Sequence, residues 1–189
     1  MGIIISAYPC CGKTYSAENL SDKYKIIDLD SSKFSWIKRT RTEEEIDDIR
    51  KEYESKAHLK TFDREKYANE IITVKNPNFI EDYMHAIKKA AEENDVVFVS
   101  SHKKVRQALQ DNNLSYYTIY PENKESVKNE WLGRMYSRGS DEVFMKFQSS
   151  NWDEFTSNID NEPHGKQIIR LSNGEYISEK LLEKLIFLG

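Results

Sequence analysis

Short apolar runs rich in β-branched residues recur along the chain and alternate with helical patterns. The five runs are residues 3–5, 24–30, 96–99, 116–120 and 167–171. Runs with apolar residues at most successive positions are typical of strands that are covered on both faces of a parallel sheet. Because such strands alternate here with helical stretches, the pattern predicts βαβ units and an α/β fold with a five-stranded parallel sheet flanked by helices.

Apolar positions three to four residues apart predict the helices between these strands. One helix is expected over 13–20, a second over 80–91, a third over 105–109 and a last one over 177–185. Ser101 or His102 is expected near the N-cap of the third, because short polar side chains satisfy the free backbone N–H groups at a helix start.

The segment 41–70 differs from the rest because it is dominated by charge. It holds seven basic and ten acidic residues, and its thin apolar stripe consists of Ile46, Ile49, Tyr53 and Ala57. Such a pattern favours a solvated helix packed on one side only. We interpret residues 41–75 as a charged helical insert between the second and third strands, within a single domain that spans residues 1–189.

The composition narrows the class of function. The 189 residues carry 28 Lys and Arg against 32 Asp and Glu, a net charge of −4, which argues against a nonspecific nucleic-acid coat but not against a local basic pocket. The two cysteines, Cys10 and Cys11, are adjacent, so neither a disulfide framework nor a four-ligand zinc site is expected. No apolar run is long enough to cross a membrane, and residues 1–6 lack a basic leader, so a cytoplasmic protein is expected.

The strongest motif, residues 7–14, follows the first strand and opens the first helix. It matches the phosphate-binding pattern GxxxxGK[ST], except that Ala7 replaces the first glycine, and Cys10 also stands where many nucleotide kinases have a glycine. In this pattern Lys13 reaches the β- and γ-phosphates, and the Thr14 hydroxyl binds Mg²⁺. The alternative is a plain strand-to-helix turn with an exposed lysine.

Two acids, Asp28 and Asp30, lie two residues apart at the end of the second strand, so their side chains share a face. Ligands of open parallel sheets bind beyond the carboxyl ends of the strands. One carboxylate can accept the proton of an acceptor hydroxyl while the other orders Mg²⁺ through water, and we favour Asp30 for catalysis. The alternative is that both acids cap the turn at Ser31 and Ser32.

The third strand ends at Ser100, where many P-loop enzymes have a metal-binding acid. Ser100 can contact Mg²⁺-bound water or Thr14, which makes the Asp28/Asp30 pair more important. Arg134 and Arg138 are one helical turn apart and can together clamp phosphates during phosphoryl transfer. The alternative is an ordinary surface helix with two arginines.

These motifs resemble those of the P-loop nucleoside and nucleotide kinases, of the adenylate and thymidylate kinase type. The segments 27–34, 76–79, 97–102, 120–121 and 134–139 more narrowly resemble a bacteriophage branch of small P-loop kinases. Members of that branch are described as deoxynucleoside monophosphate kinases, adenylate-kinase-like proteins or kinases of 5-hydroxymethyluracil in phage DNA. The resemblance implies a three-layer P-loop NTPase fold with an arginine-bearing lid over 122–160, and host cytoplasm if the protein is phage-encoded.

The resemblance also implies roles for individual residues. Lys13, Asp28, Asp30, Arg134 and Arg138 would be catalytic, and Thr14, Asp30 and Ser100 would surround Mg²⁺. ATP would contact a set made of the phosphate loop and a loop near the adenine: Pro9, Cys10, Cys11, Gly12, Lys13, Thr14, Tyr15, Ser172, Asn173 and Gly174. The segment after Ser32 would form the acceptor side.

Three functions therefore remain open at the level of sequence. The first is ATP- and Mg²⁺-dependent phosphoryl transfer to a nucleotide-type acceptor, most simply a deoxynucleoside monophosphate. The second is phosphorylation of 5-hydroxymethyluracil within DNA, in which DNA is a partner only as a substrate. The third is a regulatory NTP-binding protein or P-loop ATPase, favoured by the missing acid on the third strand and by Ala7.

Overall fold

A five-stranded parallel sheet forms the centre of the protein, as the sequence pattern predicts. The computed structural model describes residues 1–56, 61–161 and 167–188. The strand order is β2-β5-β1-β6-β7, and every neighbouring pair in this sheet is parallel. The strands are β1 (Ile3–Ala7), β2 (Ile26–Asp28), β5 (Val96–Val99), β6 (Tyr116–Pro121) and β7 (Gln167–Leu171).

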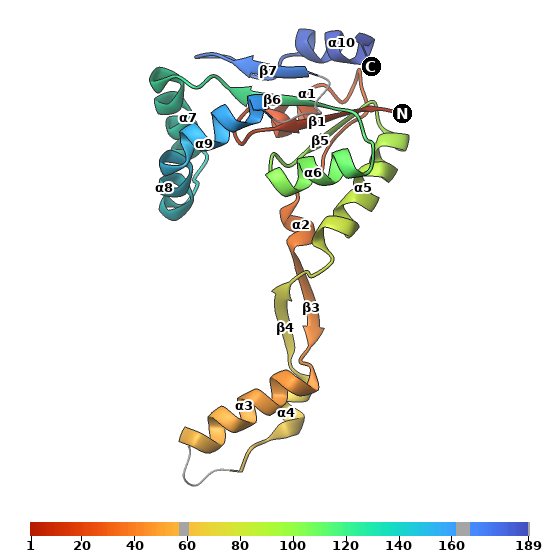
Figure 1. The fold of residues 1–189 in the computed structure, drawn as a ribbon. Coiled ribbons are helices and arrows are strands. Elements are labelled where there is room, and N and C mark those ends of the chain that lie inside the picture. The colour runs from red at the N-terminus through yellow and green to blue at the C-terminus, as the bar shows by residue number, and fades with distance from the viewer. Residues whose placement is uncertain (57–60, 162–166, 189) are drawn as a thin grey trace. The chain divides into compact units, whose positions relative to one another are not determined.

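Helices cover both faces of this sheet. In Figure 1, α5 and α6 lie on one side and α10 lies on the other. The four predicted helices are confirmed with small shifts at their ends, and His102 is the N-cap of α6. The helices of this part are α1 (Lys13–Asn19), α5 (Phe79–Glu93), α6 (Lys103–Asp111), α7 (Glu125–Ser137), α8 (Glu142–Ser150), α9 (Trp152–Ser157), η1 (Asn158–Asn161, a 3₁₀ helix) and α10 (Glu179–Leu188).

The core lies around the three central strands. Every residue of β1, β5 and β6 is buried, whereas the edge strands β2 and β7 are mostly half-buried. On β1, the alternate residues Ile3, Ile5 and Ala7 join one cluster with Leu182 and Leu185 of α10. This alternation follows from the pleat, which turns successive side chains to opposite faces. It explains why strands with helices on both faces contain apolar residues at every position.

The chain divides into two units, Met1–Ser31 with Ile80–Gly189, and Ser32–Phe79. The second unit contains α2 (Ser32–Ser35), β3 (Trp36–Thr40), α3 (Glu43–Lys56), α4 (Arg64–Asn69) and β4 (Ile71–Lys75). β3 and β4 pair antiparallel, in a register that runs from Trp36↔Lys75 to Thr40↔Ile71. The insert is thus wider than the predicted 41–75, and it combines a two-stranded ribbon with the expected charged helices.

The ribbon was not predicted from the sequence. Its strands alternate exposed and half-buried positions and carry lysine and arginine. β3 lacks the apolar run by which the five sheet strands were recognised, and the β-branched run of β4 was included in the helical insert because it directly follows the charged segment 41–70. Within this unit Ile46 of the predicted apolar stripe is buried, with 2% of its surface exposed, and Phe62 stacks on Tyr67 with ring centres 5.2 Å apart. Ala57 of the same stripe lies outside the described residues.

No helix in the described part of the chain has both the length and the apolar character needed to span a membrane.

Candidate functional site

The loop that joins β1 to α1 contains two residues with a left-handed backbone. Cys10 has φ 63° and Gly12 has φ 99°. Lys13 folds back across the loop, and its Nζ donates a hydrogen bond to the carbonyl of Ala7 at 2.9 Å. The predicted phosphate loop therefore begins and ends where the motif places it. Cys10 adopts a left-handed conformation that costs a non-glycine residue energy.

Thr14 and Asp28 meet beside this loop. The Thr14 hydroxyl donates a hydrogen bond to Oδ2 of Asp28 at 2.9 Å. Asp28 is the last residue of β2 and lies next to Phe98 of β5 in the sheet register. Asp30, two residues further, is exposed. The structure thus brings together the predicted Mg²⁺ ligand Thr14 and the first of the two predicted acids.

Tyr83 of α5 connects the ends of β2 and β5 behind these acids. Its hydroxyl donates to the Leu29 carbonyl at 2.6 Å and accepts a hydrogen bond from the Ser100 N–H at 3.0 Å. Burial raises the pKa of the Tyr83 phenol, and the neighbouring charges of Asp28 and Asp30 raise it further. The phenol therefore remains a neutral donor. Sequence reasoning assigned Tyr83 to the apolar face of a helix, although a buried tyrosine hydroxyl needs a partner.

Ser100 lies at the end of β5, as predicted, and its backbone and hydroxyl take part in local hydrogen bonds. Its carbonyl accepts from the Ser6 hydroxyl at 3.2 Å, and its hydroxyl accepts from the His102 N–H at 3.3 Å. In the described residues, no group of three or more His, Cys, Asp and Glu side chains is arranged to hold a metal ion.

A second polar cluster near Lys13 was not predicted. Arg106 of α6 is only 5% exposed, and it donates to the Tyr120 hydroxyl at 2.7 Å and to the Ser101 carbonyl. Desolvation lowers the pKa of His102, and the positive charges of Arg106 and Lys13 lower it further. His102 therefore lies within electrostatic reach of the phosphate loop. The signal available in the sequence was an arginine four residues after a histidine, on one helix face.

Arg134 of α7 lies against the phosphate loop, with its side chain largely enclosed. The side chain is 8% exposed and forms an ion pair with Glu130. Its guanidinium carbon is 3.8 Å from the ring centre of Trp131 and 3.7 Å from that of Tyr176. Nη1 also donates to the Cys10 carbonyl at 3.4 Å. The Arg134 guanidinium, held by Glu130, Trp131 and Tyr176, thus positions the loop between β1 and α1. The sequence analysis did not consider this role.

The same helix binds the loop at a second point. The indole N–H of Trp131 donates to the Pro9 carbonyl at 3.1 Å. Arg138, by contrast, caps the end of α7 and is exposed. The two arginines therefore lie one turn apart, as predicted, but in different surroundings.

Residues 172–177 pack between α7 and the phosphate loop. Glu130 accepts hydrogen bonds from the Asn173 side chain at 2.9 Å and from the Gly174 N–H at 2.8 Å. The Ile177 N–H donates to the Cys11 carbonyl at 2.9 Å. Ser172, Asn173 and Gly174 are thus near the loop that was predicted to bind ATP. Glu130 was missed because a single glutamate on a charged helix has no distinctive sequence pattern.

Electrostatics distinguish the two cysteines of the loop. Cys11 is completely buried, and burial raises its pKa to about 12. Cys10 is half-buried. Cys11 is therefore a neutral packing residue, while Cys10 retains access to solvent. Cys11 is therefore also a poor metal ligand, since metals bind thiolates.

The chain matches none of the known protein-family profiles and none of the curated protein sequences with which it was compared.

Proposed function

We propose that this protein transfers a phosphoryl group from ATP, with Mg²⁺, to a nucleotide-type acceptor, most simply a deoxynucleoside monophosphate. The observation that carries the proposal is the hydrogen bond from Thr14 to Asp28, beside a loop across which Lys13 is folded. The N–H groups of such a loop and its lysine are the groups that cradle a β,γ-phosphate, and hydroxyl and carboxylate oxygens are the groups that hold the accompanying Mg²⁺.

The residues present suit Mg²⁺ and ATP. The Thr14 hydroxyl and the Asp28 carboxylate are hard oxygen ligands at hydrogen-bonding distance, 2.9 Å, and they would hold the ion directly or through water. Bound Mg²⁺ would neutralise charge on the phosphate oxygens. Lys13 would leave the Ala7 carbonyl and bind the phosphates in its place.

The remaining assignments follow from chemistry. In this proposal Asp30 accepts the proton of an acceptor hydroxyl or orients the acceptor phosphate, because it is exposed next to Asp28. Tyr83 fixes the backbone that carries both acids. Arg138 contributes positive charge from the lid, 122–160, whereas Arg134 positions the phosphate loop through its contacts with Cys10 and Glu130.

The test uses γ-labelled ATP with Mg²⁺ and two acceptor panels, namely free deoxynucleoside monophosphates and oligonucleotides that contain 5-hydroxymethyluracil. We expect transfer to a free monophosphate, whereas transfer only to the oligonucleotides would favour the DNA kinase. The Lys13→Ala variant should lose ATP binding. The Asp30→Ala variant should bind ATP and transfer about 10²-fold more slowly or worse, while the exposed control Asp22→Ala should behave like wild type.

A regulatory NTP-binding protein or ATPase is the second candidate, and the enclosure of Arg134 favours it. An arginine already paired with Glu130 and stacked on two rings is less available to clamp a transition state. ATP binding, with or without hydrolysis, but with no transfer to either acceptor panel would favour this candidate. A wild-type transfer rate in Asp30→Ala would remove Asp30 from the catalytic set.

A further inference from the structure

One face of the β3–β4 ribbon is exposed along its whole length. The antiparallel register pairs Trp36 with Lys75, Lys38 with Thr73 and Thr40 with Ile71. Directly paired residues share a face of a two-stranded sheet. We call these six residues the ribbon face, and all six are exposed. The residues on the opposite face, Ile37, Arg39, Ile72 and Val74, are half-buried.

The ribbon is basic, although the chain as a whole is acidic. Segments 32–41 and 71–79 contain five basic residues and no acidic residue. Two of the five are paired, Arg39 with Glu45 and Arg41 with Glu70. Lys38 and Lys75 form no ion pair within the described ranges and lie diagonally on the ribbon face. This charge is complementary to a polyanion.

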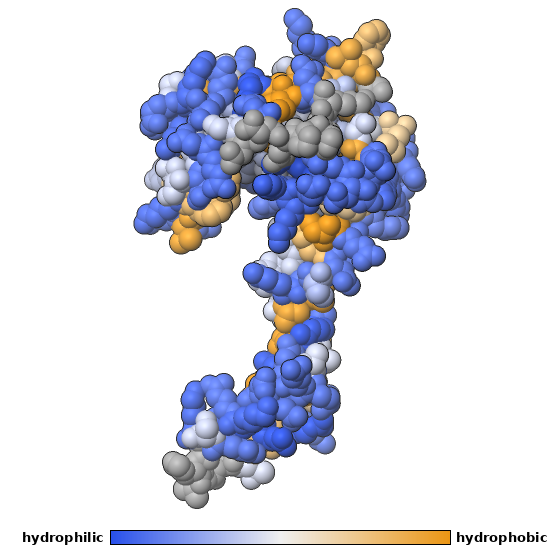
Figure 2. All heavy atoms as spheres, in the orientation of Figure 1, coloured by the Kyte–Doolittle hydropathy of each residue, from blue (hydrophilic) through white to orange (hydrophobic). Residues whose placement is uncertain are grey.

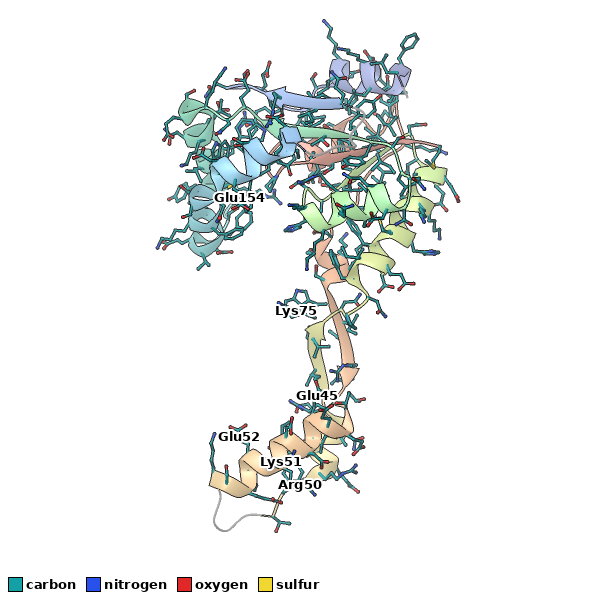
Figure 3. The ribbon with its side chains drawn as sticks, in the orientation of Figure 1. Glu45, Arg50, Lys51, Glu52, Lys75 and Glu154 are labelled. Atoms are coloured by element: carbon teal, nitrogen blue, oxygen red, sulfur yellow. The ribbon has the colours of Figure 1, made fainter. Side chains whose placement is uncertain are left out.

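Aromatic side chains lie next to these lysines. A hollow of about 250 Å³ is lined by Ser35, Trp36, Lys75, Asn76 and Phe79. Trp36 is 52% exposed, which is unusual for a side chain that gains so much from burial. Figure 2 shows apolar side chains exposed among hydrophilic ones along the ribbon, and Figure 3 labels Lys75 on β4. The hollow thus combines two aromatic walls with one ammonium group.

We propose that the ribbon face binds single-stranded nucleic acid. Unpaired bases stack on exposed aromatic side chains, and lysines track the phosphates, which is how sequence-tolerant single-strand sites are built. Trp36 would stack a base over the hollow, Lys38 and Lys75 would contact phosphates, and Thr40 and Thr73 would add neutral hydrogen bonds. A duplex hides its bases and cannot enter such a hollow. This site is separate from the proposed ATP site and does not depend on it.

The helices of the same unit limit the size of this surface. Residues 42–70 contain ten acidic residues and six basic ones, so a polyanion is attracted to the ribbon but not to α3 or α4. The site is therefore local, which agrees with the argument from net charge against a nonspecific coat. We expect the affinity for the single strand to fall steeply as the salt concentration rises. The reason is that a single strand releases roughly 0.7 counterions for each phosphate that the protein neutralises.

The experiment titrates the full chain into a fluorescently labelled single-stranded DNA oligonucleotide and follows anisotropy at several salt concentrations. Lys38→Ala and Lys75→Ala should each weaken binding and reduce the slope of log K against log salt by about 0.7. Trp36→Ala should weaken binding by about 5- to 100-fold. Lys51→Ala is the control and should leave binding unchanged, because Lys51 lies on α3 (Figure 3) and pairs there with Asp48.

Tryptophan fluorescence gives a second measurement that does not rely on alanine variants. Trp131 and Trp152 are buried, at 0% and 1% exposure, whereas Trp36 is 52% exposed. Stacking of a base should therefore quench only Trp36, and Trp36→Phe should abolish the quenching while preserving most of the binding. The same titrations are repeated with single-stranded RNA and with duplex DNA. Tighter binding of single-stranded RNA or of single-stranded DNA identifies which of the two nucleic acids the ribbon face prefers.

Three results would overturn the proposal. These are absence of binding at low salt, equal binding of duplex DNA without quenching, or equal losses in Lys51→Ala and Lys75→Ala. The Lys13→Ala variant separates this proposal from the proposed kinase function, because it should lose ATP binding and retain the oligonucleotide.

Discussion

The guanidinium carbon of Arg134 lies 3.7 Å from the ring centre of Tyr176 and holds that ring beside the phosphate loop. Tyr176 is 52% exposed, while the Arg134 side chain is 8% exposed. The cation is thus the enclosed partner and the ring forms part of its cover. Removing the ring would expose a cation that is otherwise paired with Glu130 and stacked on Trp131.

Substitution of Tyr176 separates the ring from its hydroxyl. Tyr176→Ala should lower the free energy of unfolding by about 0.5–2 kcal/mol, because it removes a cation–π contact with a largely desolvated guanidinium. Tyr176→Phe keeps the ring and should remain within about 0.5 kcal/mol of wild type. Urea denaturation followed by circular dichroism measures both. Equal losses in the two variants would show that the hydroxyl is the important group.

Glu130 should make the stability of the site pH-dependent. Desolvation opposes its ionisation, but hydrogen bonds from the Gly174 N–H, Arg134 and Asn173 outweigh it and hold the pKa of Glu130 below its usual value. Because the pKa is lower in the folded state, this stabilisation is present above the unfolded pKa of about 4.3 and is lost as pH falls through the folded pKa.

Glu130→Gln should therefore cost roughly 1–3 kcal/mol at pH 7, and less as the pH falls below about 4. Denaturation curves of wild type and variant at pH 7, 5 and 3.5 measure this convergence. Glu18→Gln, at an exposed glutamate of α1, is the control and should change the free energy of unfolding little. A constant gap between wild type and Glu130→Gln at every pH would contradict the charge-based explanation.

The two cysteines should differ in reactivity. Cys11 is fully buried with its pKa raised to about 12, so it holds almost no thiolate at pH 8. Cys10 is half-buried in the same loop. Titration with a thiol reagent should count one reactive cysteine in the native protein and two in denaturant. Cys10→Ser should abolish the native reaction, whereas reaction of both thiols in the native state would contradict the burial of Cys11.

The sequence was sufficient for the parallel sheet and for the turn between β1 and α1, because both depend on local patterns. Continuous apolar runs such as Val96–Val99 reflect burial on two faces, and the spacing from Ala7 to Thr14 is fixed by the turn itself. Contacts of Glu130 with Asn173 join residues 43 positions apart. No local pattern encodes such a pair, and the same holds for Tyr83 with Leu29. The β3–β4 ribbon was missed because β3 is charged and β4 directly follows the charged segment 41–70.

Two glycines provide the sharpest test of the loop geometry, because the same substitution should have opposite effects. Gly12 has φ 99°, and a Cβ there would lie 3.5 Å from the Tyr176 side chain, an ordinary contact distance. The cost of Gly12→Ala therefore comes from the left-handed backbone and should be roughly 1–2 kcal/mol. ATP binding should weaken with it, because the loop would relax from the shape that holds Lys13 next to Ala7.

Gly133 lies within helix α7, and a Cβ there would meet no atom within 4 Å. Gly133→Ala should raise the free energy of unfolding by roughly 0.5–1 kcal/mol, because alanine loses less backbone entropy than glycine in a helix. Thermal and urea denaturation of the two variants against wild type measure the pair. A neutral or stabilising Gly12→Ala would mean that the loop does not require the left-handed conformation, and this would count against the phosphate-binding interpretation of the turn.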